Sequence, residues 1–168
     1  MADMSVRPSQ LWKSMPVERR LVAADAFWQD ENGVEQQVEA VVAIAQKLKF
    51  RPRSVQTQPL EKKSRQLAHI NDVSETVATR ALIAYHLAAE RPMMGAFLDA
   101  LGIVHEDGLI AAEDTPPPNA AAVATAAKVL TDKFPADRVA LYLNTLLTQD
   151  PDTWISLDGL PQLALDLQ

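Results

Sequence analysis

The sequence contains no cysteine, and this absence removes several classes of functional site. Disulfide bonds, thiolate zinc centres, iron–sulfur clusters and cysteine nucleophiles all require a thiol. A chain without thiols is compatible with a reducing compartment. The N-terminal residues show no basic segment followed by an apolar run, so we expect no secretory signal and predict a cytoplasmic location.

Glycine, aromatic residues and long apolar runs are also scarce. The five glycines are never closely spaced, which excludes G-x-G-x-x-G and Walker-type phosphate-binding loops. Aromatic residues make up 5% of the chain and offer few surfaces on which nucleobases could stack. No window approaches the ~18 consecutive apolar residues that a bilayer-spanning helix needs, so we expect no membrane insertion.

Apolar residues are nevertheless plentiful, at 48%, and they recur mainly at helical spacing. Residues that favour strands never gather into alternating runs bounded by turn signals. The sequence therefore predicts an all-α fold, a compact orthogonal or irregular bundle of about seven helices, with a short helical-hairpin solenoid as the alternative. The main helices are expected at residues 16–29, 34–48, 59–70, 73–91, 92–101, 119–134 and 135–148.

We predict a single helical domain over residues 1–168. Residues 1–110 would form the main core, residues 111–118 a proline-rich linker, and residues 119–168 a C-terminal helical hairpin lobe. The helix at 73–91 is apolar on most sides, which is typical of a central helix in a multi-helix fold.

Several local features follow from shorter patterns. Asp72 and Glu75 have the spacing of a capping box, and Gly102 suits the left-handed position that ends a helix. In the helix at 34–48, five apolar residues are expected to face the core: Val38, Val41, Val42, Ala45 and Leu48. Residues 49–58 are expected to form a loop and residues 105–108 a polar turn.

Charge is unevenly distributed along this acidic chain, whose net charge is −6. Residues 47–65 hold seven basic residues and one acidic residue, whereas residues 99–168 hold three basic and eleven acidic residues. The simplest interpretation of the basic segment is a solvated cationic loop. A second is pairing with an acidic protein surface, such as the C-terminal part of another subunit. Nucleic acid is the least favoured partner, because the chain is acidic and poor in aromatics. The candidate binding residues are Lys49, Arg51, Arg53, Lys62, Lys63 and Arg65.

A second constellation could hold a divalent transition metal. His86 and Glu90 are four residues apart and would share one face of a helix, and His105 follows in the segment His105-Glu106-Asp107-Gly108. A metal bound there could activate a water molecule. The simpler interpretation is a near-core histidine and a solvated turn. His69 lies close to Asp72 in sequence, and the favoured interpretation is a helix-terminal histidine.

These patterns favour a non-enzymatic function without a cofactor. We predict a helical protein-interaction or regulatory module that self-associates into a homo-oligomer or binds a protein partner. The alternatives are a metal-dependent enzyme that uses His86, Glu90 and His105, and a nucleic-acid accessory protein that uses the basic segment 47–65.

Overall fold

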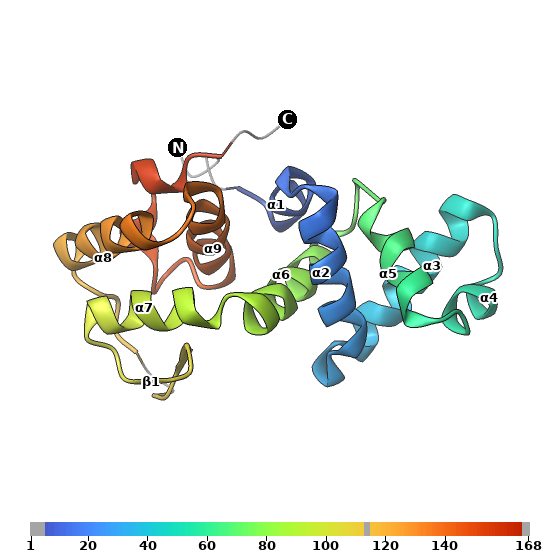
Figure 1. The fold of residues 1–168 in the computed structure, drawn as a ribbon, viewed down its shortest axis with the longest axis horizontal. Helices are drawn as coiled ribbons and strands as arrows, with labels where there is room; N and C mark the ends of the chain where they lie inside the picture. The colour runs from blue at the N-terminus through green and yellow to red at the C-terminus, as the bar shows by residue number, and fades with distance from the viewer. Residues whose placement is uncertain (1–5, 113–114, 166–168) are drawn as a thin grey trace. The chain divides into compact units, whose positions relative to one another are not determined.

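A computed structural model describes residues 6–112 and 115–165, and their regular structure is helical apart from one two-stranded hairpin (Figure 1). The all-α prediction is confirmed. The chain divides into two compact units. The N-terminal unit comprises residues 8–89, and the C-terminal unit comprises residues 90–165 with residues 6 and 7. Along the sequence, the boundary between the units lies at Ala89–Glu90. The lobe boundary predicted from the sequence lies at 111–118, and residues 113 and 114 of that segment are outside the described residues.

The N-terminal unit contains six α-helices. They are α1 (Pro8–Ser14), α2 (Val17–Gln29), α3 (Val34–Leu48), α4 (Pro52–Gln56), α5 (Leu60–Ala68) and α6 (Glu75–Ala89), with the 3₁₀ turn η2 (Glu31–Gly33) before α3. Helix α6 packs against α1, α2 and α3, as expected for a helix with apolar residues around most of its circumference. Its buried side chains include Val77, Leu82 and Tyr85.

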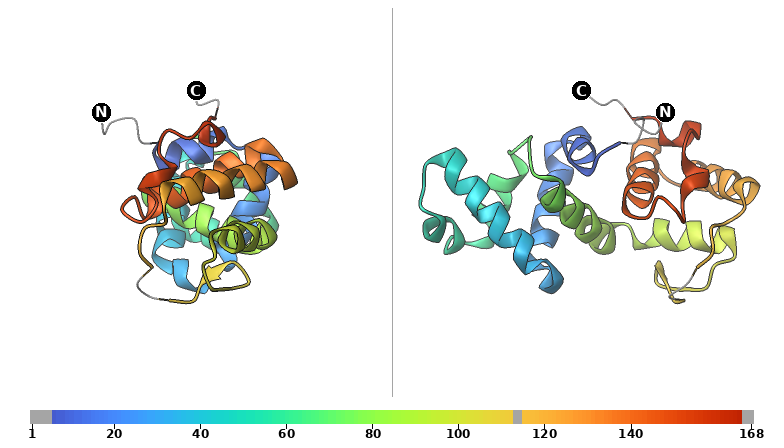
Figure 2. Two further views of the ribbon diagram at one scale, coloured as in Figure 1. Left: turned by 90° about the vertical axis from the view of Figure 1, so that its left-hand side faces the viewer. Right: turned by 180° about the vertical axis from the view of Figure 1, so that it is seen from behind.

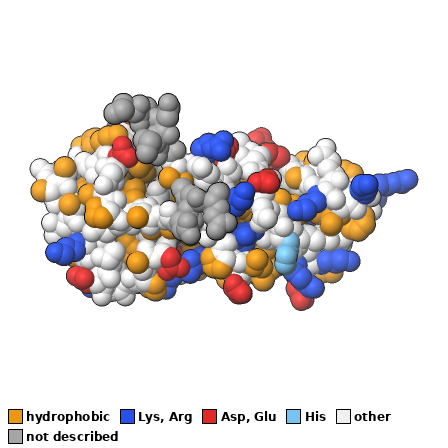
Figure 3. Space-filling model, turned by 90° about the horizontal axis from the view of Figure 1, so that it is seen from above, with side chains coloured by type: hydrophobic (Ala, Val, Ile, Leu, Met, Phe, Trp, Pro, Cys, Tyr) orange, Lys and Arg blue, Asp and Glu red, His pale blue; other side chains and the backbone are white. Residues whose placement is uncertain are grey.

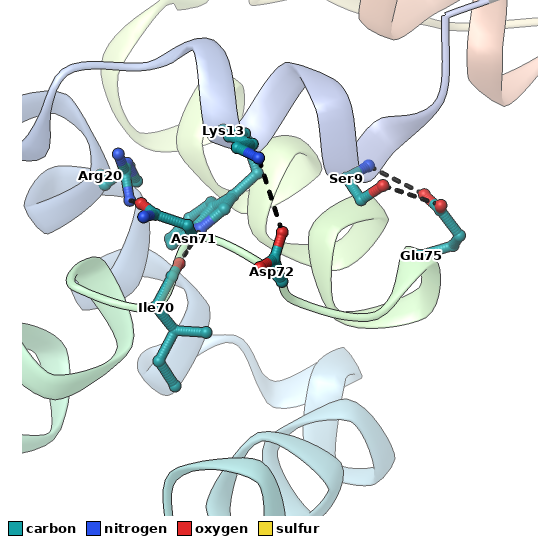
Figure 4. Close-up of polar contacts among 8 residues, drawn as sticks. Ser9, Lys13, Arg20, Ile70, Asn71, Asp72 and Glu75 are labelled. Carbon is teal, nitrogen blue, oxygen red and sulfur yellow. Dashed lines mark hydrogen bonds and ion pairs between the residues drawn. The ribbon is translucent and has the colours of Figure 1, made fainter. Parts of the chain in front are cut away.

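A polar cluster holds the junction between α5 and α6 against α1 and α2 (Figure 4). The buried Arg20 guanidinium donates to the carbonyl oxygens of Met15 at 3.0 Å and Ala68 at 2.9 Å, and to Asn71 Oδ1 at 3.0 Å. The Trp12 indole N–H donates to the Ile70 carbonyl at 2.7 Å. The bonds to Ala68 and Ile70 satisfy backbone carbonyls that the end of α5 leaves without helical partners. The cluster is therefore structural.

The capping box predicted at the start of α6 is wrong. The side chain that caps this helix is Ser74, whose hydroxyl accepts from the Val77 N–H at 3.2 Å. The Glu75 carboxylate instead accepts from the backbone N–H and the hydroxyl of Ser9 in α1, each at 2.8 Å (Figure 4). A tertiary contact therefore replaces the local pairing that the spacing suggested.

The C-terminal unit contains α7 (Arg91–Leu101), the strands β1 (His105–Glu106) and β2 (Leu109–Ile110), α8 (Ala120–Lys133) and α9 (Ala136–Gln149), followed by the 3₁₀ turns η3 (Ile155–Leu157) and η4 (Pro161–Leu163). Its core is partly aromatic. The Phe97 ring lies 5.8 Å from the Tyr142 ring and 5.7 Å from the Trp154 ring, measured between centroids. Gly102 ends α7 with φ of 72°, which confirms the predicted left-handed position.

Two short elements were not expected. The segment 49–58, predicted as a loop, contains α4, which begins at Pro52 and is anchored by the fully buried Val55. The polar turn at 105–108 is the turn of a hairpin in which β1 and β2 pair antiparallel. Its central residues Asp107 and Gly108 have φ of 52° and 91°, the positive values that a type I′ turn requires. Figure 2 shows this hairpin beside α7, which both strands contact.

Candidate functional site: the groove beside helix α3

The residues of the metal hypothesis each have partners within the protein. His86 is buried in α6, and its Nδ1 lies 2.8 Å from the Leu82 carbonyl oxygen. The buried Glu90 carboxylate pairs with the Arg138 guanidinium of α9 through two hydrogen bonds, one of them 2.7 Å between Nε and Oε2. In the part of the chain that the structure describes, no three His, Asp or Glu residues gather where they could hold a metal ion. The metal hypothesis therefore remains a prediction without structural support.

Both ring nitrogens of His105 form hydrogen bonds that hold the hairpin in place. Its Nδ1 accepts from the Gly108 backbone N–H at 3.0 Å, so the ring proton is placed on Nε2, which lies 2.7 Å from Asp99 Oδ1. In this arrangement no lone pair remains for a metal or for proton abstraction. The neighbouring Arg91 donates to the Asp107 carbonyl at 3.1 Å and also pairs with the Asp107 carboxylate.

The hairpin lies tightly against α7 because two glycines permit it. A Cβ atom on Gly95 would lie 3.2 Å from His105 Cε1, and one on Gly108 would lie only 2.8 Å from Met94 Cβ. The candidate segment for chemistry therefore has a structural role, because it packs closely against α7. This segment is His105-Glu106-Asp107-Gly108.

The third histidine also has a structural role. His69 Nδ1 lies 2.8 Å from the Arg65 carbonyl oxygen at the end of α5. Asp72, its suggested partner, pairs instead with Lys13 of α1, with 3.8 Å between Nζ and Oδ1 (Figure 4). The interpretation of His69 as a helix-terminal residue agrees with this placement.

The basic segment 47–65 forms an exposed surface on α3, α4 and α5. Figure 3 shows Lys and Arg side chains standing out where these helices lie in Figure 1. Arg65 pairs with Glu61 at 3.2 Å. Among the described residues, the other six cations have no carboxylate partner: Lys47, Lys49, Arg51, Arg53, Lys62 and Lys63. Phe50 is the one aromatic residue among the exposed large hydrophobic side chains described, so bases would find little to stack on.

A groove of about 190 Å³ lies beside this cationic surface, between α3 and α4. We call it the α3 groove; its lining residues are Trp28, Val34, Gln37, Val38, Val41, Val42, Pro52, Gln56 and Lys63. Lys49, with φ of 58°, ends α3 and turns the chain so that α4 packs against α3. Gln37 fixes the other end, because its amide donates to the carbonyls of Phe27 and Asp30.

The prediction that five apolar residues of α3 face the core is only partly right. Val41 and Ala45 are buried as predicted. The other three predicted core residues are exposed: Val38 at 54%, Leu48 at 40% and Val42 at 38%. Val34, one turn before Val38, is 59% exposed. The apolar face of α3 is therefore wider than the core that covers it, and its exposed valines line the groove.

Trp28 and Lys63 contact each other in the lining of the groove. The Lys63 ammonium lies 4.8 Å from the centroid of the Trp28 ring, within cation–π distance. Trp28 is 9% exposed, and its indole N–H finds no acceptor among the described residues. No local pattern shows that a groove would form around Trp28.

No family model matches this chain, and neither curated proteins nor solved structures include a match to it. Among the described residues, the helices are too short or too polar for any of them to cross a bilayer. The groove and the charges around it are thus the features from which a function can be argued.

Proposed function

We propose that this chain is a non-enzymatic protein-interaction module that self-associates through the α3 groove. The observation that carries the proposal is a row of three exposed valines on α3 that line a groove: Val34, Val38 and Val42. Each lies one helical turn after the one before it. Contiguous exposed apolar surface with a polar rim is characteristic of protein interaction sites. The cysteine-free composition supports a cytoplasmic setting.

The charges around the groove support a protein partner. Six cations of the basic segment lack carboxylate partners among the described residues, so they are available to an incoming acidic surface. Charges on the rim of an interface steer association and select partners, while the apolar centre supplies most of the affinity. This chain itself carries an acidic surface of the required sign, since residues 99–168 hold eleven acidic and three basic residues.

The hydrogen bonds of His105 and Glu90 in the C-terminal unit support a non-enzymatic role. The ring nitrogens of His105 bond to Gly108 and Asp99, and the Glu90 carboxylate is paired with Arg138. These groups hold a hairpin and a helix in place. Their hydrogen-bonding capacity is used for structure, not directed toward a substrate.

Light scattering on two single variants tests the proposal. Val38→Asp places a carboxylate in the apolar row of the groove, and we expect it to weaken self-association at least tenfold, or about 1.4 kcal/mol. Val22→Asp is the matched control, because Val22 is also an exposed valine of the N-terminal unit but does not line the groove. Equal mass for wild type and both variants over the same concentration range would contradict the proposal.

A further inference from the structure

We infer that the α3 groove binds the outer face of the β1–β2 hairpin of a second copy of this chain. This inference rests on the proposed self-association and adds the identity of the surface that enters the groove. The outer hairpin face is defined here as Val104, Glu106 and Leu109.

The hairpin register separates an inner face from this outer face. Side chains alternate along a strand, and Glu106 is paired across the hairpin with Leu109, so both point to the same side. His105 points to the other side, toward Gly95 of α7. Val104 is 76% exposed and Leu109 is 46% exposed, so two large aliphatic side chains flank one exposed carboxylate.

Hydrogen bonds within the hairpin and between the hairpin and α7 order this outer face before it binds. His105 bonds to Asp99 and to the Gly108 N–H, and Arg91 bonds to the Asp107 carbonyl. A surface that is already ordered loses less conformational entropy on association than a flexible loop does. The hairpin therefore has the rigidity expected of a docking surface.

The chemistry of the two surfaces is complementary. The groove offers apolar valine side chains and the Lys63 ammonium. The outer hairpin face offers two aliphatic side chains and the Glu106 carboxylate, which forms no ion pair with any described residue. The aliphatic side chains would contact the valines of the groove, and the carboxylate between them would meet the Lys63 ammonium that lines it.

Charge argues against the simplest alternative, in which two grooves pack against each other. A symmetric groove-to-groove contact would bring two basic segments together, each with seven basic residues and one acidic residue. Such like-charge contact opposes association. A contact between the groove and the acidic C-terminal unit of a second copy joins opposite charges.

A complementation experiment tests the inference in the full-length chain. One variant, Val38→Asp, has a damaged groove and an intact hairpin. The other, Val104→Asp with Leu109→Asp, has an intact groove and a damaged hairpin. All three positions are exposed, so both variants are expected to fold, which circular dichroism and thermal melting would verify. Ile155→Asp is the matched control, since Ile155 is an exposed aliphatic residue of the C-terminal unit outside the hairpin.

Sedimentation velocity is expected to show wild type and Ile155→Asp as self-associating and each damaged variant alone as monomeric. An equimolar mixture of the two damaged variants is expected to form a heterodimer, because each supplies the surface that the other lacks. The hairpin assignment is overturned if the hairpin variant self-associates as tightly as wild type, if the mixture stays monomeric, or if Ile155→Asp is the variant that loses association. Each of these results leaves the groove proposal standing as long as Val38→Asp loses association. A wild type that is monomeric at every concentration overturns both.

Discussion

The His105 ring is oriented by the Gly108 backbone, whose N–H donates to Nδ1 at 3.0 Å across the turn of the hairpin. This bond directs Nε2 toward Asp99 and brings Gly108 against Met94 of α7. A segment whose composition suggested chemistry is therefore explained by geometry. The consequences of this arrangement can be measured.

Gly108→Ala is expected to detach the hairpin from α7. The new Cβ would lie 2.8 Å from Met94 Cβ, and the residue would have to keep φ at 91°. Gly159→Ala is the matched control, because Gly159 has φ of 83° but no atom within 4 Å of the new Cβ. We expect the control to lose about 1 kcal/mol of unfolding free energy from backbone strain alone, and Gly108→Ala to lose about 2–4 kcal/mol. Equal losses in urea unfolding would show that the contact with Met94 does not matter.

Zinc is expected to leave the melting temperature of the protein unchanged. Both nitrogens of His105 are occupied by hydrogen bonds, and Glu90 is paired with Arg138. Thermal melting with and without Zn²⁺ in excess checks this point. A rise of several degrees that disappears in His105→Ala would revive the metal hypothesis.

The ion pair between Glu90 and Arg138 is expected to stabilise the C-terminal unit strongly. Arg138→Met would remove the guanidinium that pairs with the buried Glu90 carboxylate, at a cost of about 3 kcal/mol. Arg65→Met is the matched control, because the Arg65–Glu61 pair lies on the exposed surface of α5 and contributes about 0.3–0.5 kcal/mol. Chemical denaturation of both variants would measure the difference, and a loss below 1 kcal/mol for Arg138→Met would contradict the expected role.

Tyr142 is expected to make the protein less stable in alkali. Burial raises the pKa of its phenol above the ordinary value near 10. The folded state therefore keeps the proton at a pH where the unfolded state releases it. This contribution to stability is complete below pH ~10 and is lost at about 1.4 kcal/mol per unit of pH above it.

Tyr142→Phe isolates this effect, because phenylalanine can keep the ring contact with Phe97 but has no proton to release. Urea unfolding of wild type and variant should give stability curves that run parallel below pH ~10 and converge or cross above it. Curves that stay parallel throughout would mean that the phenol does not resist ionisation in the folded protein.

The helical framework could be predicted because its signals are local. Helix α6 is apolar around most of its circumference, and Gly102 marks the end of α7 in the way that a left-handed cap requires. The hairpin was missed although Asp107-Gly108 is a strong turn signal, because its two-residue strands are too short to show alternation. Helix α4 was missed because Val55 is its single buried side chain.

The candidate site could not be predicted, since it depends on what the rest of the fold leaves uncovered. Periodicity places Val38, Val41 and Val42 on neighbouring parts of α3 but cannot show that only Val41 would be covered. The pairing of Glu90 with Arg138 joins residues 48 positions apart, which no local pattern reveals. The basic segment was visible in the sequence, whereas the groove beside it appears only once α4 packs against α3.

The most direct test of self-association through the groove is sedimentation velocity of wild type and Val38→Asp from about 1 to about 100 µM, a range that detects dissociation constants in the micromolar region. We expect the wild-type sedimentation coefficient to rise with concentration, and the rise to be smaller at high salt because rim charges contribute. Val38→Asp is expected to remain monomeric over the whole concentration range. A wild type that remains monomeric, or a Val38→Asp variant that associates as the wild type does, would contradict the proposal.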